Sequence, residues 1–152
     1  MANNPYMTPE KIRLFLLDRT PSDNFLLDDV DFANESIALA CELTLARFQE
    51  TEPFVQQQFT IETFPHPYTF LLGVCSILLK SKAVNMKRNS LNYQSASGTA
   101  VDDKKTADDY LMLAADFSKE FDDKARKLKT NENINEGYGF QGSQYAWNTP
   151  LF

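Results

Sequence analysis

The sequence predicts a mainly α-helical fold: a small bundle of about four helices, with an inserted β-hairpin or extended loop and an extended C-terminal arm. Four stretches place apolar residues three and four positions apart, the spacing of an amphipathic helix. Residues 89–102 separate the last two stretches and alternate like a strand. Residues 130–152 mix aromatic residues with glycine and show no helical period. The predicted organisation is a helical domain over 1–129, which includes the 89–102 insertion, followed by an arm over 130–152.

The first helix is predicted in "TPEKIRLFLLD". Thr8 suits the N-cap, Pro9 suits the first helical position, and Glu10 complements the positive end of the helix dipole. The turn-forming stretch "RTPSDN" ends the helix near Asp18. Its apolar face consists of Ile12, Phe15 and Leu16.

The second helix is predicted from about Asn34 to about Glu50. Phe32 precedes it and can fold back onto Ile37 as a hydrophobic staple. A second apolar group widens the helix beyond one stripe and indicates two neighbours, either within the fold or from another subunit. The first stripe contains Ile37, Ala40, Cys41, Thr44, Leu45 and Phe48, and the second group contains Leu39, Leu43 and Ala46.

The third helix is predicted from about Pro67 to about Met86, after a short extended segment in which Phe59, Ile61 and Thr63 alternate with polar residues. Its first half, "YTFLLGVCSILL", is apolar almost all the way round, which is typical of the central helix of a bundle. That stretch is shorter than the roughly 20 residues that span a bilayer, so no membrane association is expected. The second half of the helix is basic.

The polar stretch after the third helix predicts a β-hairpin or an extended flap. Leu91 and Tyr93 alternate before the Ser97–Gly98 pair, and Thr99 and Val101 alternate after it. Glycine tolerates the positive φ that a tight hairpin turn requires. An isolated hairpin is marginally stable in water, so these four side chains are candidate contacts with a partner. The alternative is a loose loop.

The fourth helix is predicted from about Lys104 to about Lys129, with an apolar stripe of Tyr110, Ala114, Phe117, Phe121 and Leu128. The arm that follows is rich in aromatic residues, which are depleted in disordered tails. We expect the arm to lie on another surface, and the alternative is that it folds back on its own helices. Its candidate contact residues are Tyr138, Phe140, Tyr145 and Trp147.

Composition and charge narrow the functional classes. The chain has 152 residues, a net charge of −6 and 43% hydrophobic residues, as expected for one globular domain. Its isoelectric point of about 4.7 disfavours tight nucleic-acid binding. Charge is uneven: residues 1–79 hold four Lys and Arg against eleven Asp and Glu, whereas residues 80–129 hold eleven against eight. These halves could dock head to tail in an assembly, or they could simply be solvated helix faces.

No motif indicates catalysis, a metal or a cofactor. His66, the sole histidine, lies between two prolines at a helix start, and neither Cys41 nor Cys75 has a metal-ligand neighbour in sequence. Phosphate-binding glycine loops and a G-x-S-x-G nucleophile elbow are missing. The recurring acid pairs fit caps and solvated faces, although carboxylates distant in sequence could still converge. We therefore expect the protein not to be an enzyme and to carry no cofactor. The two cysteines lie within apolar stripes of the predicted helices, which favours a reducing compartment.

The order of these features resembles the head–tail connector (adaptor or neck) proteins of tailed bacteriophages. The resemblance covers most of residues 8–147, and its most specific pieces are "RNSLNY" and the closing "NINEGYGFQGSQYA". The longer aromatic end "YAWNTPLF" departs from the family pattern and leaves open which component it contacts.

The resemblance implies a structural virion protein that is assembled in the host cytoplasm and located at the capsid vertex. Members form a homo-oligomeric ring, usually dodecameric, below the portal protein, and they offer a platform for the tail or the next neck protein. DNA passes through the channel of the ring without specific binding. The alternative is another phage assembly or packaging component, such as a tail-completion protein or a DNA-binding, terminase-like helical protein that uses the basic stretch "KSKAVNMKRN".

Overall fold

The computed structural model describes residues 8–18, 30–56, 58–89 and 103–138. This part of the chain contains four α-helices and no strand: α1 (Pro9–Leu16), α2 (Asn34–Glu50), α3 (Pro67–Asn89) and α4 (Asp103–Tyr138). The prediction of a mainly α-helical fold with four helices is confirmed. The predicted hairpin begins at Asn89, the last residue of α3, and its remaining residues lie outside the described part.

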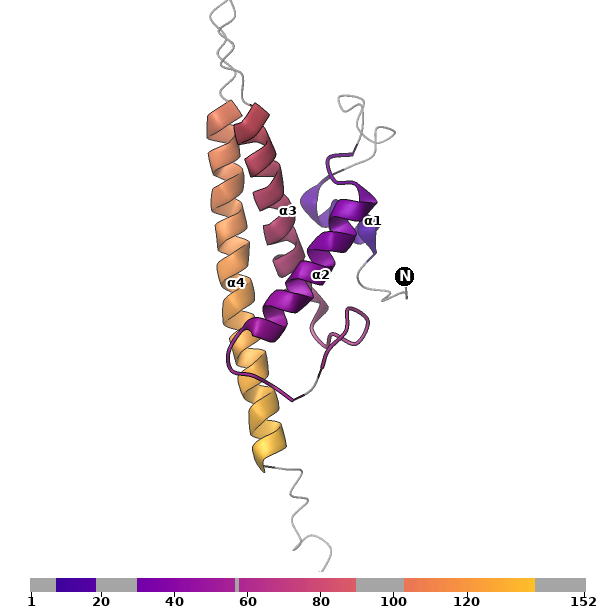
Figure 1. The fold of residues 1–152 in the computed structure, drawn as a ribbon, viewed down its shortest axis with the longest axis vertical. Helices are drawn as coiled ribbons and strands as arrows, with labels where there is room; N and C mark the ends of the chain where they lie inside the picture. Colours follow the sequence, from indigo (N-terminus) through magenta and orange to yellow (C-terminus); the bar gives the residue numbers. More distant parts are fainter. Residues whose placement is uncertain (1–7, 19–29, 57, 90–102, 139–152) are drawn as a thin grey trace, which may run out of the picture.

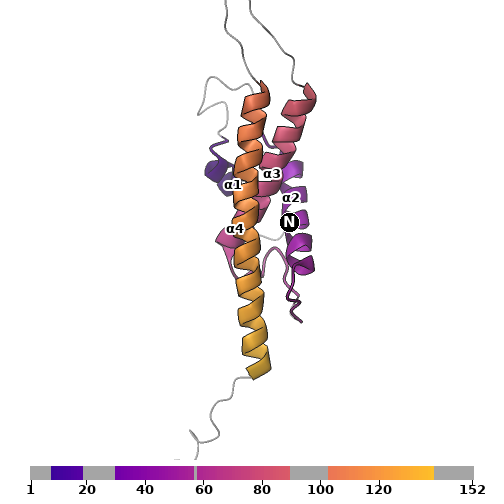
Figure 2. The same cartoon turned by 90° about the vertical axis from the view of Figure 1, so that its left-hand side faces the viewer.

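Helices α3 and α4 run antiparallel and side by side in both views, and they form the most extensive helix pair (Figures 1 and 2). Helices α1 and α2 both pack on α3, and Figure 2 shows them on opposite sides of α4. At its C-terminal end α4 continues beyond the other three helices, at the bottom of Figure 1. The described part is therefore an elongated helical hairpin with two shorter helices packed against it.

The core lies where the other helices meet α3. Phenylalanine rings dominate it: the ring centroids of Phe48 and Phe64 are 4.8 Å apart, and those of Phe64 and Phe70 are 5.1 Å apart. Such tilted and edge-on pairs contribute beyond their buried area. The core cluster consists of Ile12, Phe32, Ile37, Ala40, Cys41, Phe48, Phe59, Phe64, Phe70, Leu72, Val74, Cys75, Leu78, Phe121 and Ala125.

Helix α3 has the central place that its apolar first half predicted. By length and composition alone this 23-residue helix could also cross a membrane, but 56% of its apolar window is buried inside the structure. A core helix of a soluble protein passes the same test, so the burial against three neighbouring helices accounts for its composition.

Gly73 of α3 lies where α2, α3 and α4 approach one another. A Cβ atom at this position would lie 2.5 Å from Cγ2 of Thr44 on α2 and 2.9 Å from Cδ2 of Phe121 on α4. These distances are far below van der Waals contact. Glycine is therefore required for close packing of the three helices.

A polar network around the buried Asp18 joins α1 to the start of α2. The Asp18 carboxylate accepts hydrogen bonds from the backbone N–H groups of Asp31 (2.8 Å) and Phe32 (3.1 Å). Arg13 donates to the Phe32 carbonyl (2.8 Å) and to Oδ1 of Asn34 (2.6 Å). Thr8 takes the N-cap position of α1 as predicted, with its carbonyl accepting from Ile12 at 3.2 Å, but its side chain makes no cap hydrogen bond to the backbone.

The extended segment predicted at residues 59–63 is wrong beyond Thr60. Residues 61–63 form a turn, in which the Thr60 N–H donates to the Thr63 hydroxyl (2.9 Å) and the Thr63 N–H donates to the Thr60 hydroxyl (3.2 Å). Threonine hydroxyls often close turns in this way. Phe59 and Phe64 are buried on either side of this turn.

The predicted end of the last helix at Lys129 is also wrong, because α4 continues to Tyr138. Residues 130–138 have weak helix propensity, but extending an existing helix avoids the cost of nucleation. The extension is also anchored: Nδ2 of Asn133 donates to the Phe54 carbonyl at 2.9 Å. The extended arm predicted from residue 130 is therefore helical as far as Tyr138, and residues 139–152 lie outside the described part.

Candidate interaction surfaces

The contact residues predicted from the sequence are mostly beyond the described structure. Leu91, Tyr93, Thr99 and Val101 fall in the gap between α3 and α4, and Phe140, Tyr145 and Trp147 follow the end of α4. Tyr138 is the last residue of α4 and belongs to a helix instead of an extended arm. The described part brings none of these eight residues together, so the candidate surfaces must come from the helices.

The outer side of α2 carries an apolar surface that stays about half exposed in the described part of the chain. We define the α2 ridge as Leu39, Leu43 and Ala46, at positions i, i+4 and i+7 of one helix face. Leu39 is 56% exposed and Leu43 is 47% exposed. The opposite face of α2 is buried against the core. The sequence predicted two neighbours for this helix. In the described structure α2 packs on α3, contacts α1 and is joined to α4 through Arg47, yet the α2 ridge remains outside these contacts and about half exposed.

The surroundings of the α2 ridge are acidic. Glu35, Glu42 and Glu50 are exposed on the same helix. Arg47 is the one cation in the α2 sequence, and it turns toward α4, where Nη2 lies 2.7 Å from Oδ2 of Asp122. The same nitrogen donates to the Ser118 hydroxyl at 2.6 Å. The outer side of α2 therefore presents leucines flanked by glutamates.

The exposed second half of α3 has the opposite charge. We define the α3 basic face as Lys80, Val84 and Arg88, at positions i, i+4 and i+8; Val84 is 48% exposed and the two cations are exposed. Lys80 and Arg88 form no ion pair with another described residue, so both charges face solvent.

The other two cations of the basic stretch are engaged within the fold. Lys82 forms an ion pair with Asp31 and lies 5.3 Å from the ring centroid of Tyr110. Lys87 lies 2.7 Å from Oδ1 of Asp108. These ion pairs partly neutralise the positive charge that the stretch could offer to phosphate groups, although Lys87 and Asp108 are both exposed and their pair is weak.

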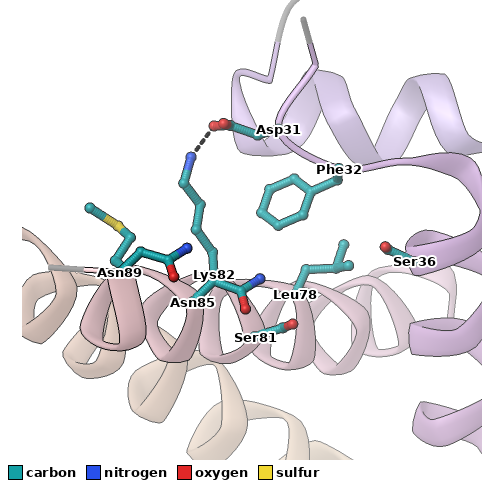
Figure 3. A pocket seen from close by; sticks show the side chains of 9 residues that line it. Asp31, Phe32, Ser36, Leu78, Ser81, Lys82, Asn85 and Asn89 are labelled. Atoms are coloured by element: carbon teal, nitrogen blue, oxygen red, sulfur yellow. Dashed lines mark hydrogen bonds and ion pairs between the residues drawn. The ribbon is translucent and has the colours of Figure 1, made fainter.

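A polar groove of about 390 Å³ lies between the start of α2 and the second half of α3 (Figure 3). The ion pair of Lys82 and Asp31 links α3 to the segment before α2, and Phe32 and Leu78 supply apolar lining. Hydroxyl and amide groups of Ser36, Ser81, Asn85 and Asn89 complete most of the wall. These groups can hydrogen-bond a polar ligand, but the lining contains no nucleophile beside a general base.

Lys129 is a residue that sequence reasoning missed. It is 1% exposed, and its Nζ donates to the carbonyls of Gln49 (3.2 Å) and Thr51. Nζ also lies 4.8 Å from the ring centroid of Phe48. The lysine thus satisfies carbonyls at the C-terminal end of α2, where the helix dipole favours a cation. A signal was available, because Lys129 continues the buried register of Phe121 and Ala125 at four-residue steps.

The two cysteine thiols in the core are shielded from solvent. Burial raises the pKa of the Cys41 thiol to about 11 and that of Cys75 to about 12. Both cysteines are free and buried, and His66 is exposed. Within the described ranges, no three His, Cys, Asp or Glu side chains are placed to share a metal ion. The candidate functional features of this part of the chain are therefore its surfaces.

The chain was compared with models of known protein families, with curated proteins and with solved structures. None of these comparisons yields a match.

Proposed function

We propose that this protein is a structural component of a tailed-phage virion that forms a ring below the portal, joins the capsid to the tail and extends the DNA channel. The observation that carries the proposal is the α2 ridge. Two leucines of one helix point away from the core and remain about half exposed. Burial of their exposed surface in an interface would contribute roughly 1 kcal/mol per leucine in each subunit. The resemblance of the sequence to connector proteins supplies the architectural context.

The charge of the protein suits a channel wall. A net charge of −6 repels the phosphate backbone, so DNA can slide past the subunits without being captured. A DNA-binding role would need a run of free cations, but Lys82 and Lys87 each lie beside a carboxylate, that of Asp31 and that of Asp108. We therefore favour assembly over DNA recognition, with the portal and the tail or next neck protein as partners. We propose no enzymatic activity and no cofactor.

Native mass spectrometry and electron microscopy test the proposal. We expect the full chain to form a large ring, with twelve subunits as the family expectation, either alone or when the portal protein of the same phage is added. Antibody labelling of purified virions should mark the capsid vertex. A chain that remains monomeric with and without portal protein would exclude the proposed function.

A matched pair of variants tests the observation that carries the proposal. Leu39→Ser with Leu43→Ser should shift the mass distribution from ring to monomer while leaving thermal unfolding nearly unchanged, because both leucines are already half exposed. Leu14→Ser with Leu113→Ser removes two other exposed leucines, from α1 and α4, and serves as the control. Equal loss of assembly in both pairs would mean that general surface hydrophobicity, and not the α2 ridge, drives association.

A further inference from the structure

We propose that the α2 ridge of one subunit docks on the α3 basic face of the next subunit, a second copy of this chain. This inference rests on the proposed ring and names the two surfaces that close it. Both surfaces are exposed and lie on the described helices, and their charges are opposite.

The two faces match in charge and in spacing. On α2, Glu42 and Glu50 are eight residues apart and flank the ridge between them, where Leu43 and Ala46 lie. On α3, Lys80 and Arg88 are also eight residues apart, with Val84 midway between them. Eight residues of α-helix correspond to about 12 Å. A helix packed along another helix can therefore bring each cation near one glutamate.

Apolar packing between the faces is also complementary. Leu39 and Leu43 are one helical turn apart and form a ridge with a shallow gap between them. Val84 is the exposed apolar side chain at the centre of the α3 basic face. It is short and branched, and it can enter such a gap. The interface would then have an apolar centre and a charged rim, the usual arrangement of protein interfaces.

One subunit can offer both faces at the same time. Leu78 of α3 shares the polar groove with Ser36 of α2, which shows the side of α3 that faces the start of α2 (Figure 3). Lys80 and Val84 lie two and six residues further along α3, on a different side of the helix, because each residue turns the helix by about 100°. Lys80 lines a second groove with Arg47 of α2 and Ala114 of α4, so the α3 basic face borders α2. None of the α2 ridge residues lines that groove, so the two faces are separate parts of the surface.

Charge disfavours the symmetric alternatives. If the α2 ridge packed on the same ridge of a second copy, the glutamates of both copies would face each other. If two α3 basic faces met, Lys80 and Arg88 of both copies would repel. A contact between two different faces is heterologous, and repetition of such a contact closes a ring when the rotation per subunit allows it.

Charge reversal with rescue in trans tests the inference on the full-length chain. An acid-reversed variant carries Glu42→Lys and Glu50→Lys, and a base-reversed variant carries Lys80→Glu and Arg88→Glu. Each variant alone brings like charges together at the proposed contact, so each should lose the ring in native mass spectrometry and electron microscopy. An equimolar mixture pairs opposite charges at every contact and should restore rings in which the two variants alternate.

Charge-matched controls come from the outer surface of α4. Lys119→Glu with Lys127→Glu changes the net charge as the base-reversed variant does, at two exposed lysines that are also eight residues apart. Asp109→Lys with Asp116→Lys matches the acid-reversed variant at exposed positions. Both controls should assemble as the unmodified chain does. All measurements are made with and without portal protein.

The outcomes separate the two proposals. In the first case the unmodified chain forms rings. If either reversed variant then also forms rings alone, or if the mixture fails to restore rings, the named interface is wrong and the ring function stands. If the unmodified chain forms no ring in either condition, the proposed function fails and the interface fails with it.

Discussion

At the residue scale, two charged side chains of the described residues are almost fully buried, and both bind backbone groups that lie outside the helical hydrogen-bond pattern. Asp18 is 6% exposed and accepts from two N–H groups before α2, and Lys129 is 1% exposed and donates to two carbonyls at its other end. Burial lowers the pKa of Lys129 because it disfavours the ammonium form. The negative charge of Asp18 lies near the N-terminal end of α2, and the positive charge of Lys129 lies near its C-terminal end. Each charge is opposite to the partial charge of the helix dipole at that end and therefore stabilises α2.

Replacement of Lys129 by methionine should destabilise the fold. Lys129→Met retains the long side chain but leaves the Gln49 and Thr51 carbonyls without their buried donor, which costs about 2 kcal/mol. Urea unfolding monitored by circular dichroism measures this difference. Lys127→Met on the same helix changes an exposed lysine and should alter stability by less than about 0.5 kcal/mol. Equal effects from the two variants would contradict the assigned role of Lys129.

The buried thiols should make the free energy of unfolding decrease at alkaline pH. The folded-state pKa values of Cys41 and Cys75 are raised from 9.0 to about 11 and about 12, so above pH 9 the unfolded chain releases thiol protons that the folded chain retains. The stabilisation is complete below pH 9 and is lost as pH rises through 11 to 12. Urea unfolding at pH 8 and at pH 10.5 should show a decrease. The double variant Cys41→Ala with Cys75→Ala should show a smaller decrease, and an equal slope would refute this cause.

At the scale of helices, the fold depends on how closely α2 and α4 approach α3. Arg47 bridges α2 and α4 through Asp122 and Ser118, and its guanidinium lies 5.2 Å from the ring centroid of Phe121. On the other side of the hairpin, the rings of Phe15 and Phe117 join α1 to α4 with centroids 5.9 Å apart. Helix α4 therefore has a neighbour on each side of its contact with α3.

Two glycine substitutions should have opposite effects. Gly73→Ala forces a methyl group against Thr44 and Phe121, and such overpacking costs about 1–3 kcal/mol, which exceeds the gain in helix propensity. Gly137→Ala meets nothing within 4 Å near the end of α4 and should stabilise that end by up to about 1 kcal/mol. Thermal unfolding of the two variants measures both changes. A stabilised Gly73→Ala protein would contradict the close approach of the three helices.

At the scale of the whole molecule, charge is segregated between surfaces that are available for contact. Glutamates flank the leucines of α2, and exposed cations flank Val84 on α3. In a monomer such segregation has little energetic consequence, because exposed charges are screened by water and salt. In an assembly the same charges select which faces meet.

Assembly should weaken at high salt. Raising ionic strength from about 0.1 M to 1 M shortens the Debye length from about 10 Å to 3 Å and screens the charged rim of the interface. We expect the concentration of chain at which half is assembled to rise severalfold, measured by light scattering after size exclusion. Assembly that is indifferent to salt would indicate that charge does not guide subunit contacts, even if the leucines of α2 remain essential.

Much of the helical architecture could be predicted from local patterns. The bounds of α2 agree with the predicted Asn34 and Glu50, and the start of α3 agrees with Pro67. These predictions succeeded because helical periodicity, proline positions and capping preferences are local in sequence. The end of α4 was missed because its continuation to Tyr138 is supported by contacts with distant residues, such as the bond from Asn133 to Phe54.

The candidate surfaces also divide into features that local sequence patterns predicted and features that depend on contacts between distant residues. The sequence indicated that α2 has two apolar sides, but it left open whether the second neighbour was internal or another subunit. The structure shows that Leu39 and Leu43 stay about half exposed in the described part of the chain. It also separates the cations of the basic stretch into Lys82 and Lys87, which are engaged, and Lys80 and Arg88, which are exposed. Sequence spacing alone does not reveal which partners distant segments bring.

The sequence by itself determined that the protein is mainly helical, that α3 is central, and that the chain carries a net charge of −6. Those properties depend on residue type and periodicity, which are complete in the linear chain. Only the tertiary structure decided that Lys129 binds the end of α2, that Gly73 permits three helices to meet, and that the α2 ridge faces outward. Each of these depends on residues far apart in sequence, whose contacts arise only when the helices pack.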